Sequence, residues 1–252
     1  MAKRPYLSLT QTTAAIHGDE PSRTLIERAY AQLRDDIVEG RLAPCEKLRV
    51  EHLKSHYGVG AGTLREAITR LVSDALVEAE GQRGFRVAPI AMEDLEDLTQ
   101  LRLHIEIEAL RQSIRNGGDG WRAQLRSAYE EMSGFEQPIR PEHRRRWEAL
   151  NTRFHEALLA GAPSAWTLKV LRLLARHGER YRRYAITINL VESGRDVHAE
   201  HRQIFELAMD GQEARAALAL EAHIRATPDL LQRAWREGRL NLDAAPGLAA
   251  SA

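Results

Sequence analysis

The sequence predicts a mainly α-helical fold in two parts: three helices with a β-hairpin, followed by an all-α antiparallel helical bundle. Most of the 252 residues carry Leu, Ala, Arg and Glu at helical spacing, and strand-like patterning is confined to one short stretch. Glycine and proline turn signals divide the helical remainder into apolar-striped segments. Because the loops between these segments are short, neighbouring helices are expected to run antiparallel.

Composition and charge set the broad class of protein. Hydrophobic residues make up 43% of the chain, which is enough for a sizeable core in one large domain or two ordinary ones. The formal net charge of +0 argues against a nonspecific polyanion binder, but it allows basic residues to be concentrated on one small surface. The single cysteine, Cys45, excludes an internal disulfide framework and a cysteine-rich metal site.

Signals for export or membrane insertion are missing from the sequence. No apolar run approaches the length that crosses a bilayer, and the segment from Met1 to Pro21 lacks the apolar centre of a secretion signal. We therefore expect a cytoplasmic protein without a membrane partner. Residues 1–20 offer little to bury and are expected to form a disordered arm.

Three helices are predicted after this arm. The first runs from Ser22 and ends at Gly40, with a stripe formed by Leu25, Ala29, Leu33 and Ile37. A short second helix is predicted to end at Gly58. The stripe from Leu64 to Val72 predicts the third helix, and the sequence Thr63-x-x-Glu66 resembles a capping box, which would start this helix up to three residues late.

A β-hairpin is predicted between Leu76 and Pro89. A strand-like Leu-Val-Glu-Ala segment is followed by a turn at Gly81–Gly84 and by Phe85-Arg86-Val87. Three helices and a hairpin make the winged form of the helix-turn-helix, in which the third helix enters the DNA major groove and the wing lies beside the backbone or minor groove. We assign residues 21–89 to this DNA-binding domain.

The remaining chain shows helical periodicity only. Helices are expected near residues 92–115, 119–135, 141–161, 165–188, 194–210, 212–226 and 228–237. We assign residues 90–240 to a helical domain, for which the family resemblance given below implies effector binding and dimerisation, and residues 241–252 to a flexible tail.

DNA contacts are expected at the start of the third helix and at the wing. Arg65 can reach guanine O6 and N7 or clamp a phosphate, although a surface ion pair with Glu66 or Glu51 is the alternative. Further contacts are predicted for the residues that offer a hydroxyl, a backbone N–H or a basic or amide side chain: Arg49, Gly60, Ala61, Gly62, Thr63, Gln82 and Arg83.

The chain resembles the GntR family of bacterial repressors over the whole winged domain. The resemblance rests on Leu33–Ile37, Gly40–Pro44, Gly58-Val59, Leu64–Leu71 and Gly84–Val87. The C-terminal part resembles the FCD, or FadR-like, domain in Leu101-Arg102 with Glu106, Phe154-His155, His201–Ile204 and His223-Ile224. Together these matches imply a ligand-responsive transcription regulator.

Two short segments resemble one subgroup and also depart from the family. Lys47–Lys54 and Gly60–Arg65 resemble the carbon-starvation-induced, glutarate-responsive repressors. The family usually has Gly where this chain has Cys45, and Ser-Arg-Thr-Pro where it has Gly60–Thr63. The usual arginine and hydroxyl contacts at the start of the third helix are therefore missing, which leaves the operator sequence open.

Three of the ten histidines, His155, His201 and His223, lie at positions that match one another in three different predicted helices of the same bundle. Asn151 precedes His155 by one helical turn, so both side chains share a face. His201 and His223 flank the turn at Gly211, which brings them to one level in an antiparallel pair. This set suits a divalent transition metal, zinc first and nickel as the alternative. It resembles the metal site of FCD domains, where Asp is common in place of Asn151, and the neutral amide is expected to weaken the metal.

Two other interpretations of these histidines stay open. One is the ordinary role of buried histidines as hydrogen-bonded core groups. The other is a histidine-metal hydrolase or another metalloenzyme, since three imidazoles and a water can activate a nucleophile. His155-Glu156 is not followed by a second histidine at HExxH spacing, and neither a nucleophile–base pair nor a glycine-rich nucleotide loop is found. We therefore predict a regulator and no enzyme.

An acidic effector needs a cation that pairs with its carboxylate. Arg102, with Glu106 one turn later to hold it, is the first candidate. The stretch Tyr181–Tyr184 supplies further donors, of which Arg183 and Tyr184 are the chosen candidates, and a solvated helix face is the alternative. We expect a small organic acid, either a dicarboxylate or a sugar acid, to release a homodimer from palindromic double-stranded operator DNA.

Overall fold

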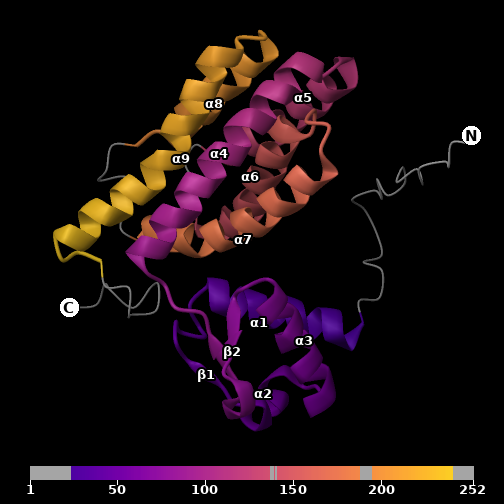
Figure 1. The fold of residues 1–252 in the computed structure, drawn as a ribbon, viewed down its shortest axis with the longest axis vertical. Helices are drawn as coiled ribbons and strands as arrows, with labels where there is room; N and C mark the ends of the chain where they lie inside the picture. The colour runs from indigo at the N-terminus through magenta and orange to yellow at the C-terminus, as the bar shows by residue number, and fades with distance from the viewer. Residues whose placement is uncertain (1–23, 137–138, 140, 188–194, 241–252) are drawn as a thin grey trace, which may run out of the picture.

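The computed structural model describes residues 24–136, 139, 141–187 and 195–240. It has two lobes, a small one made by the first three helices and a sheet, and a larger one made by the remaining helices (Figure 1). The arm expected at 1–20 and the tail expected at 241–252 lie outside the described residues. Within the described part of the chain, no helix is long and apolar enough to cross a membrane.

Helix α1 (Leu25–Val38) begins with a capping box. The side chain of Thr24 accepts a hydrogen bond from the amide of Glu27, whose carboxylate accepts one from the amide of Thr24. Helix α2 (Val50–Tyr57) ends at Gly58, whose φ of 63° is the left-handed conformation that glycine adopts without strain.

Helix α3 (Ala61–Ser73) starts earlier than the predicted capping box at Thr63 and Glu66 allowed, so that prediction is wrong. The amide of Leu64 donates to the carbonyl of Gly60 at 3.0 Å, and helical hydrogen bonding therefore begins at Gly60. Thr63 lies within the first turn. The apolar stripe of α3 packs against α1, and fully buried residues of both helices form the core of this lobe: Ala29, Leu33, Leu64, Ala67, Ile68 and Leu71.

The wing is a three-stranded antiparallel sheet in the order β1-β3-β2, where a two-stranded hairpin was predicted. Strands β2 (Val77–Ala79) and β3 (Phe85–Val87) flank the turn η1 (Gly81–Arg83), and β1 (Lys47–Leu48) pairs with the other edge of β3. Two residues are too few to show the alternation by which a strand is found in a sequence. The sequence therefore did not predict strand β1.

The larger lobe contains α4 (Met92–Asn116), α5 (Asp119–Ser133), η2 (Pro141–His143), α6 (Arg144–Leu159), α7 (Ala165–Thr187), α8 (Val197–Met209) and α9 (Glu213–Arg236). Its core is a cluster of fully buried side chains that includes Leu110, Leu125, Phe154, Ile204 and Leu220. Helices α4 and α9 lie side by side along one side of the lobe, and α7 lies at the junction with the small lobe (Figure 1).

Helix α9 corrects the prediction of two separate helices at 212–226 and 228–237. The helix continues through Pro228, which is buried within it. Proline removes one backbone hydrogen bond from a helix interior. Leu231 and Ala234 beyond it are fully buried against Met92 and Leu95 of α4, and this packing keeps the chain helical.

Candidate functional site

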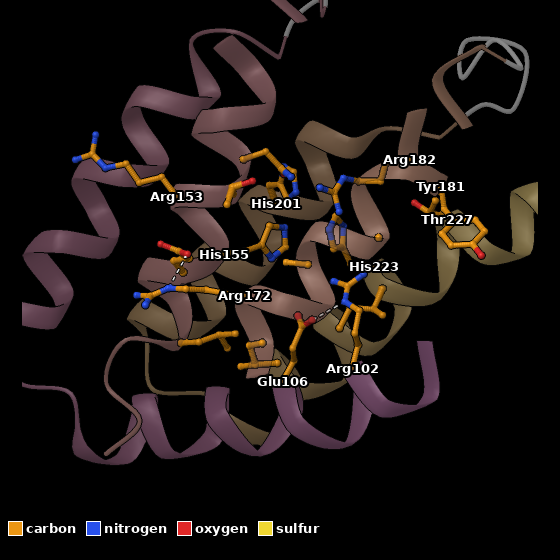
Figure 2. A pocket seen from close by; sticks show the side chains of 18 of the residues that line it. Arg102, Glu106, Arg153, His155, Arg172, Tyr181, Arg182, His201, His223 and Thr227 are labelled. Carbon is orange, nitrogen blue, oxygen red and sulfur yellow. Dashed lines mark hydrogen bonds and ion pairs between the residues drawn. The ribbon is translucent and has the colours of Figure 1, made fainter. Parts of the chain in front are cut away.

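Three imidazoles meet inside the larger lobe, one each from α6, α8 and α9. The ring centroids of His155 and His201 are 5.4 Å apart, those of His155 and His223 5.2 Å, and those of His201 and His223 4.6 Å. One ring nitrogen of each lies within 4.8 Å of the others. The three rings converge on one point at the centre of Figure 2. The structure therefore brings the three predicted histidines together.

Two carboxylates hold the rings from outside the cluster. Nδ1 of His201 lies 2.7 Å from Oε1 of Glu136, and Nδ1 of His223 lies 2.7 Å from Oε2 of Glu200. The same carboxyl of Glu136 also accepts from Trp147 Nε1 at 3.1 Å. A carboxylate on Nδ1 fixes the orientation of an imidazole and makes its other nitrogen a better electron-pair donor.

Buried nitrogen atoms without partners face the cluster. His201 is fully buried, and its Nε2 has no hydrogen-bond partner among the described residues; the same holds for Nδ1 of His155. A buried polar atom that makes no hydrogen bond costs free energy unless something else satisfies it. Three imidazoles with free nitrogens are the donor set of a zinc or nickel ion, so these residues fit a metal.

The charge state of the cluster also fits a metal. Burial, helped by the neighbouring histidines, lowers the pKa of His155 and of His223 well below the usual value. Burial raises the pKa of Glu136, but hydrogen bonds from His201 and other neighbours outweigh it, and the net shift is downward. The rings of His155 and His223 are therefore neutral and able to coordinate, whereas the carboxyl of Glu136 behind His201 is ionised.

A cavity of about 220 Å³ opens beside the cluster and is lined by all three histidines and by Asn151. Asn151 is 5% exposed and precedes His155 by one turn of α6, as predicted. The volume is below the usual range for drug-sized ligands, which favours a small molecule.

Of the arginines that line the cavity, two from different helices approach each other near the histidines. Arg102 of α4 donates from Nε to Oε1 of Glu106 at 2.7 Å, the arrangement that the sequence predicted. Both Arg102 and Arg182 of α7 line the cavity, and Figure 2 shows their side chains close to His223. The Nη1 atoms of the two arginines lie 3.4 Å and 3.5 Å from the position that a Cβ on Gly178 would take. Both distances are ordinary van der Waals contacts, so the two guanidinium groups approach the same side of Gly178.

The structure separates Arg183 from this cavity. Arg183 forms an ion pair with Glu39 of α1 and lines a different cavity, between the two lobes. The lining of the histidine cavity includes Arg182 but not Arg183, whose guanidinium is held by Glu39 on the side of α7 that contacts the small lobe. The expectation that Arg183 contacts the effector is corrected in this way. The side chain of Tyr184 lies outside the described residues.

Sequence reasoning missed four features of the site: Glu136, Glu200, Arg195 and Gly178. Arg195 lines the cavity and pairs with Glu200 through two hydrogen bonds of 2.8 Å. Glu136 follows α5 in a segment without periodicity, so no pattern could assign it. Glu200 directly precedes His201, but its carboxyl contacts the other histidine, His223, which only the packing of α8 on α9 decides.

The predicted DNA-contacting residues lie on the exposed side of the small lobe. Arg65 in α3 is exposed, and no ion pair joins it to Glu66 or Glu51 within the described residues. Arg49 before α2 and Arg83 at the wing turn are exposed as well, and Thr63 is partly exposed. Gly60 is the N-cap of α3, with Ala61 and Gly62 in its first turn, and the side chain of Gln82 is outside the described residues.

Comparison with known proteins finds two domain families in this chain. Residues 25–87 match the bacterial regulatory proteins of the gntR family, and residues 97–226 match the FCD domain. The chain belongs to the gntR family. As a member of this family with an FCD domain, it is a DNA-binding transcription regulator and not an enzyme, which sets the metallohydrolase alternative aside.

Relatives within the gntR family cover most of the chain. The HTH-type transcriptional regulator BphR of Paraburkholderia xenovorans (strain LB400) is 41% identical over 84% of this chain and 86% of its own length. The HTH-type transcriptional repressor GlaR of Escherichia coli (strain K12) is 31% identical over 81% of this chain and 94% of its own length.

Solved structures share the fold. E. coli McbR/YncC aligns with a TM-score of 0.69 at 16% identity and covers 84% of this chain and 99% of its own. A transcriptional regulator GntR from Rhodococcus sp. RHA1 aligns with a TM-score of 0.63 at 20% identity over 83% and 99% of the two chains. Because the sequence identity is this low, the similarity to these structures is evidence for the fold alone.

Proposed function

We propose that this regulator is a metal-dependent repressor whose DNA binding is released by a small carboxylate. The observation that carries the proposal is the cavity whose lining combines the three-histidine cluster with Arg102 and Arg182. With a divalent ion on the histidines, an anion that spans this cavity would meet positive charge at both ends. A dicarboxylate is the simplest such molecule, and a sugar acid is the second choice.

The proposed metal ligands are His155, His201 and His223, with Asn151 as the oxygen donor. Zinc is the first choice and nickel the alternative, because imidazole nitrogen suits both ions. The carboxylates behind His201 and His223 support this assignment, since buried histidines that bind metal usually carry such partners. A bound divalent ion would supply a Lewis-acidic centre with open positions for an anionic oxygen.

The second end of the effector is assigned to Arg102. Its guanidinium is held by Glu106 and is 17% exposed, so it is already ordered before a ligand arrives. Arg182, which the sequence put only among further donors, joins Arg102 above Gly178. A carboxylate that reaches both arginines would bridge α4 and α7, which are distant in sequence.

On the DNA side, we propose that Arg65 reads base edges and that Arg49, Thr63, Arg83 and the backbone at Gly60–Gly62 contact the phosphates and the minor groove. Their exposure supports this proposal. We further propose a homodimer, because a palindromic operator needs two winged heads at a fixed spacing. Sedimentation of the full chain at micromolar concentration tests the dimer, and a monomer that stays monomeric on operator DNA would contradict it.

Two variants test the bridging effector. We expect Arg102→Ala to keep its metal but to lose the effect of glutarate on operator affinity, because only one end of the ligand is then held. We expect His201→Ala to lose both the metal and the response. Metal analysis and operator titrations with and without glutarate measure both quantities, with DNA selected by the wild-type protein from a random pool.

The matched control is Arg126→Ala, which removes an exposed arginine on α5 outside the cavity. It should keep the metal and the full response. A full glutarate response in metal-free His201→Ala protein would refute the bridging site.

A further inference from the structure

Helix α7 carries two different functional faces. Gly178, Tyr181, Arg182 and Ala185 line the cavity of the histidine cluster. Residues just before them or between them in sequence contact the small lobe and its linker instead, namely Arg176, His177, Glu179, Arg180 and Arg183. With 3.6 residues per turn, these two sets fall on opposite sides of one helix.

We call the face of α7 that contacts the small lobe its outer face and the face that lines the cavity its inner face. The outer face contacts the C-terminal end of the recognition helix α3. Asp74 is the C-cap residue of α3, and its carboxylate pairs with Arg176 at 2.8 Å. Nε2 of His177 lies 2.8 Å from the backbone carbonyl of Asp74. The hydroxyl of Tyr30 in α1 donates to the same carboxylate, so one residue joins α1, α3 and α7.

The same face holds the end of α1. Arg183 forms an ion pair with Glu39, the C-cap residue of α1, and Glu179 forms one with Arg34 in its last turns. Both pairs are largely shielded from solvent, with side-chain exposures between 20% and 26%. Shielded charge pairs are less screened than open surface pairs, so they resist a relative shift of the helices.

The linker between the lobes is held by α7 as well. Arg180 is 4% exposed and donates to the carbonyl of Ala88 at 2.7 Å. Tyr181 donates to the carbonyl of Ala91 at 3.0 Å, and its ring lines the cavity. A movement of α7 therefore reaches the small lobe at the ends of two helices and at the linker.

On the inner face, Arg182 is held loosely. Its Nε lies 3.5 Å from Oε2 of Glu148 in α6, and neither atom has a hydrogen bond among the described residues. Glu148 lines a second cavity of about 520 Å³, between the lobes, together with Arg34, Glu39 and Arg183. A carboxylate that recruits Arg182 would move it away from a partner that it only partly satisfies.

We propose that α7 is the element that transmits effector binding to the DNA-binding domain, with Arg182 and Gly178 as its sensing face and Arg176 and Arg183 as its output face. The inference rests on the proposed effector site. Occupation of the cavity changes the position of α7, and the ion pairs to Asp74 and Glu39 carry this change to the ends of α3 and α1. The output pairs are thus required for the response and not for ligand binding.

The double variant Arg176→Gln/Arg183→Gln tests the output face. With zinc and glutarate, we expect the wild-type operator affinity to fall by about tenfold, within the usual range of allosteric coupling. In the double variant the change should be less than about twofold, while glutarate affinity measured by calorimetry stays within about twofold, because the substituted side chains lie outside the cavity. By reciprocity, operator DNA should weaken glutarate binding to the wild type only.

The matched control is Arg115→Gln, which breaks an exposed ion pair between α4 and Glu213 that touches neither cavity nor the small lobe. It should keep the wild-type response. The proposal would be overturned if the double variant binds glutarate and its operator affinity still changes as much as that of the wild type. It would also be overturned if the smaller change in operator affinity is fully explained by weaker glutarate binding.

A ligand-free experiment separates this proposal from the effector assignment. Gly178→Leu would crowd both guanidinium groups and displace them without any ligand. We expect it to change operator affinity at least about fivefold in the wild-type background and less than about twofold in the Arg176→Gln/Arg183→Gln background. Equal changes in both backgrounds, or no change in either, would overturn the role of α7. If the wild type ignores glutarate but this pattern holds, only the proposed effector is wrong.

Discussion

In the histidine cluster of the larger lobe His201 is buried and the other two histidines are partly buried, and the rings of His201 and His223 are held from behind by carboxylates. The surface of the small lobe that bears Arg65 and Arg49 is exposed, and neither side chain has an ion pair within the described residues. The first site is built to hold a small ion and a small molecule in fixed positions. The second is left open for a large partner that brings its own charges.

This difference teaches where substitutions will cost stability and where they will cost binding. A buried polar group belongs to a network, so its removal leaves partners unsatisfied and lowers the free energy of unfolding. An exposed group without partners is removed at little cost to the fold, and its loss appears only when the partner binds.

The largest effect is expected for His201→Ala. It should release the metal and lower the free energy of unfolding by about 3 kcal/mol, because the carboxylate of Glu136 loses its main partner inside the core. Metal analysis and chemical unfolding measure both changes. His198→Ala is the control, since His198 contacts the same carboxyl at 3.2 Å but is outside the cluster, and it should keep its metal. Equal metal loss in both variants would contradict the assignment.

Arg65→Ala should leave the free energy of unfolding unchanged within about 0.5 kcal/mol and weaken operator binding by about 1–3 kcal/mol, roughly fivefold to 150-fold. The reason is that Arg65 is exposed at the start of α3. Arg70→Ala, near the end of the same helix, is the control and should weaken binding less. Operator affinity measured at a fixed salt concentration tests this prediction. If both variants lose the same affinity, Arg65 does not read base edges.

The metal-free protein should lose stability in mild acid. His155 and His223 have pKa values well below their unfolded values, so below about pH 6.5 the unfolded chain binds protons that the native state does not. The stabilising contribution of each ring is present above that pH and falls by about 1 kcal/mol between pH 6.5 and 5.5. Urea unfolding with a chelator measures it. His155→Gln should reduce the pH dependence by about half, and an unchanged slope would show that His155 does not contribute.

The smallest effect is expected for Arg115→Gln on the surface of the larger lobe. Its two hydrogen bonds to Glu213 are each 2.7 Å, but the arginine is 53% exposed and the pair is screened by water and salt. We expect the free energy of unfolding to change little, and far less than in His201→Ala, because an open surface pair is screened. A loss as large as that of His201→Ala would contradict the contrast between the two kinds of site.

The repeat of apolar residues was sufficient to predict the helices and the winged arrangement, because periodicity is a local property of the sequence. It failed where tertiary packing overrides local signals. Pro228 predicted a helix end because proline has no backbone N–H to donate. Burial of the residues on both sides nevertheless keeps α9 continuous. The two-residue strand β1 exists only because β3 offers it an edge.

From the sequence, helical spacing and the turn at Gly211 predicted that His201 and His223 would lie at one level and that Glu106 would hold Arg102. That His155 would join the two histidines followed from the resemblance to the metal site of FCD domains. Only the tertiary structure decided which carboxylates stand behind the histidines and that Arg182, and not Arg183, faces the cavity. The physical reason is that a helix fixes the angle between neighbouring side chains, but the direction in which the helix turns its faces is set by what packs against it.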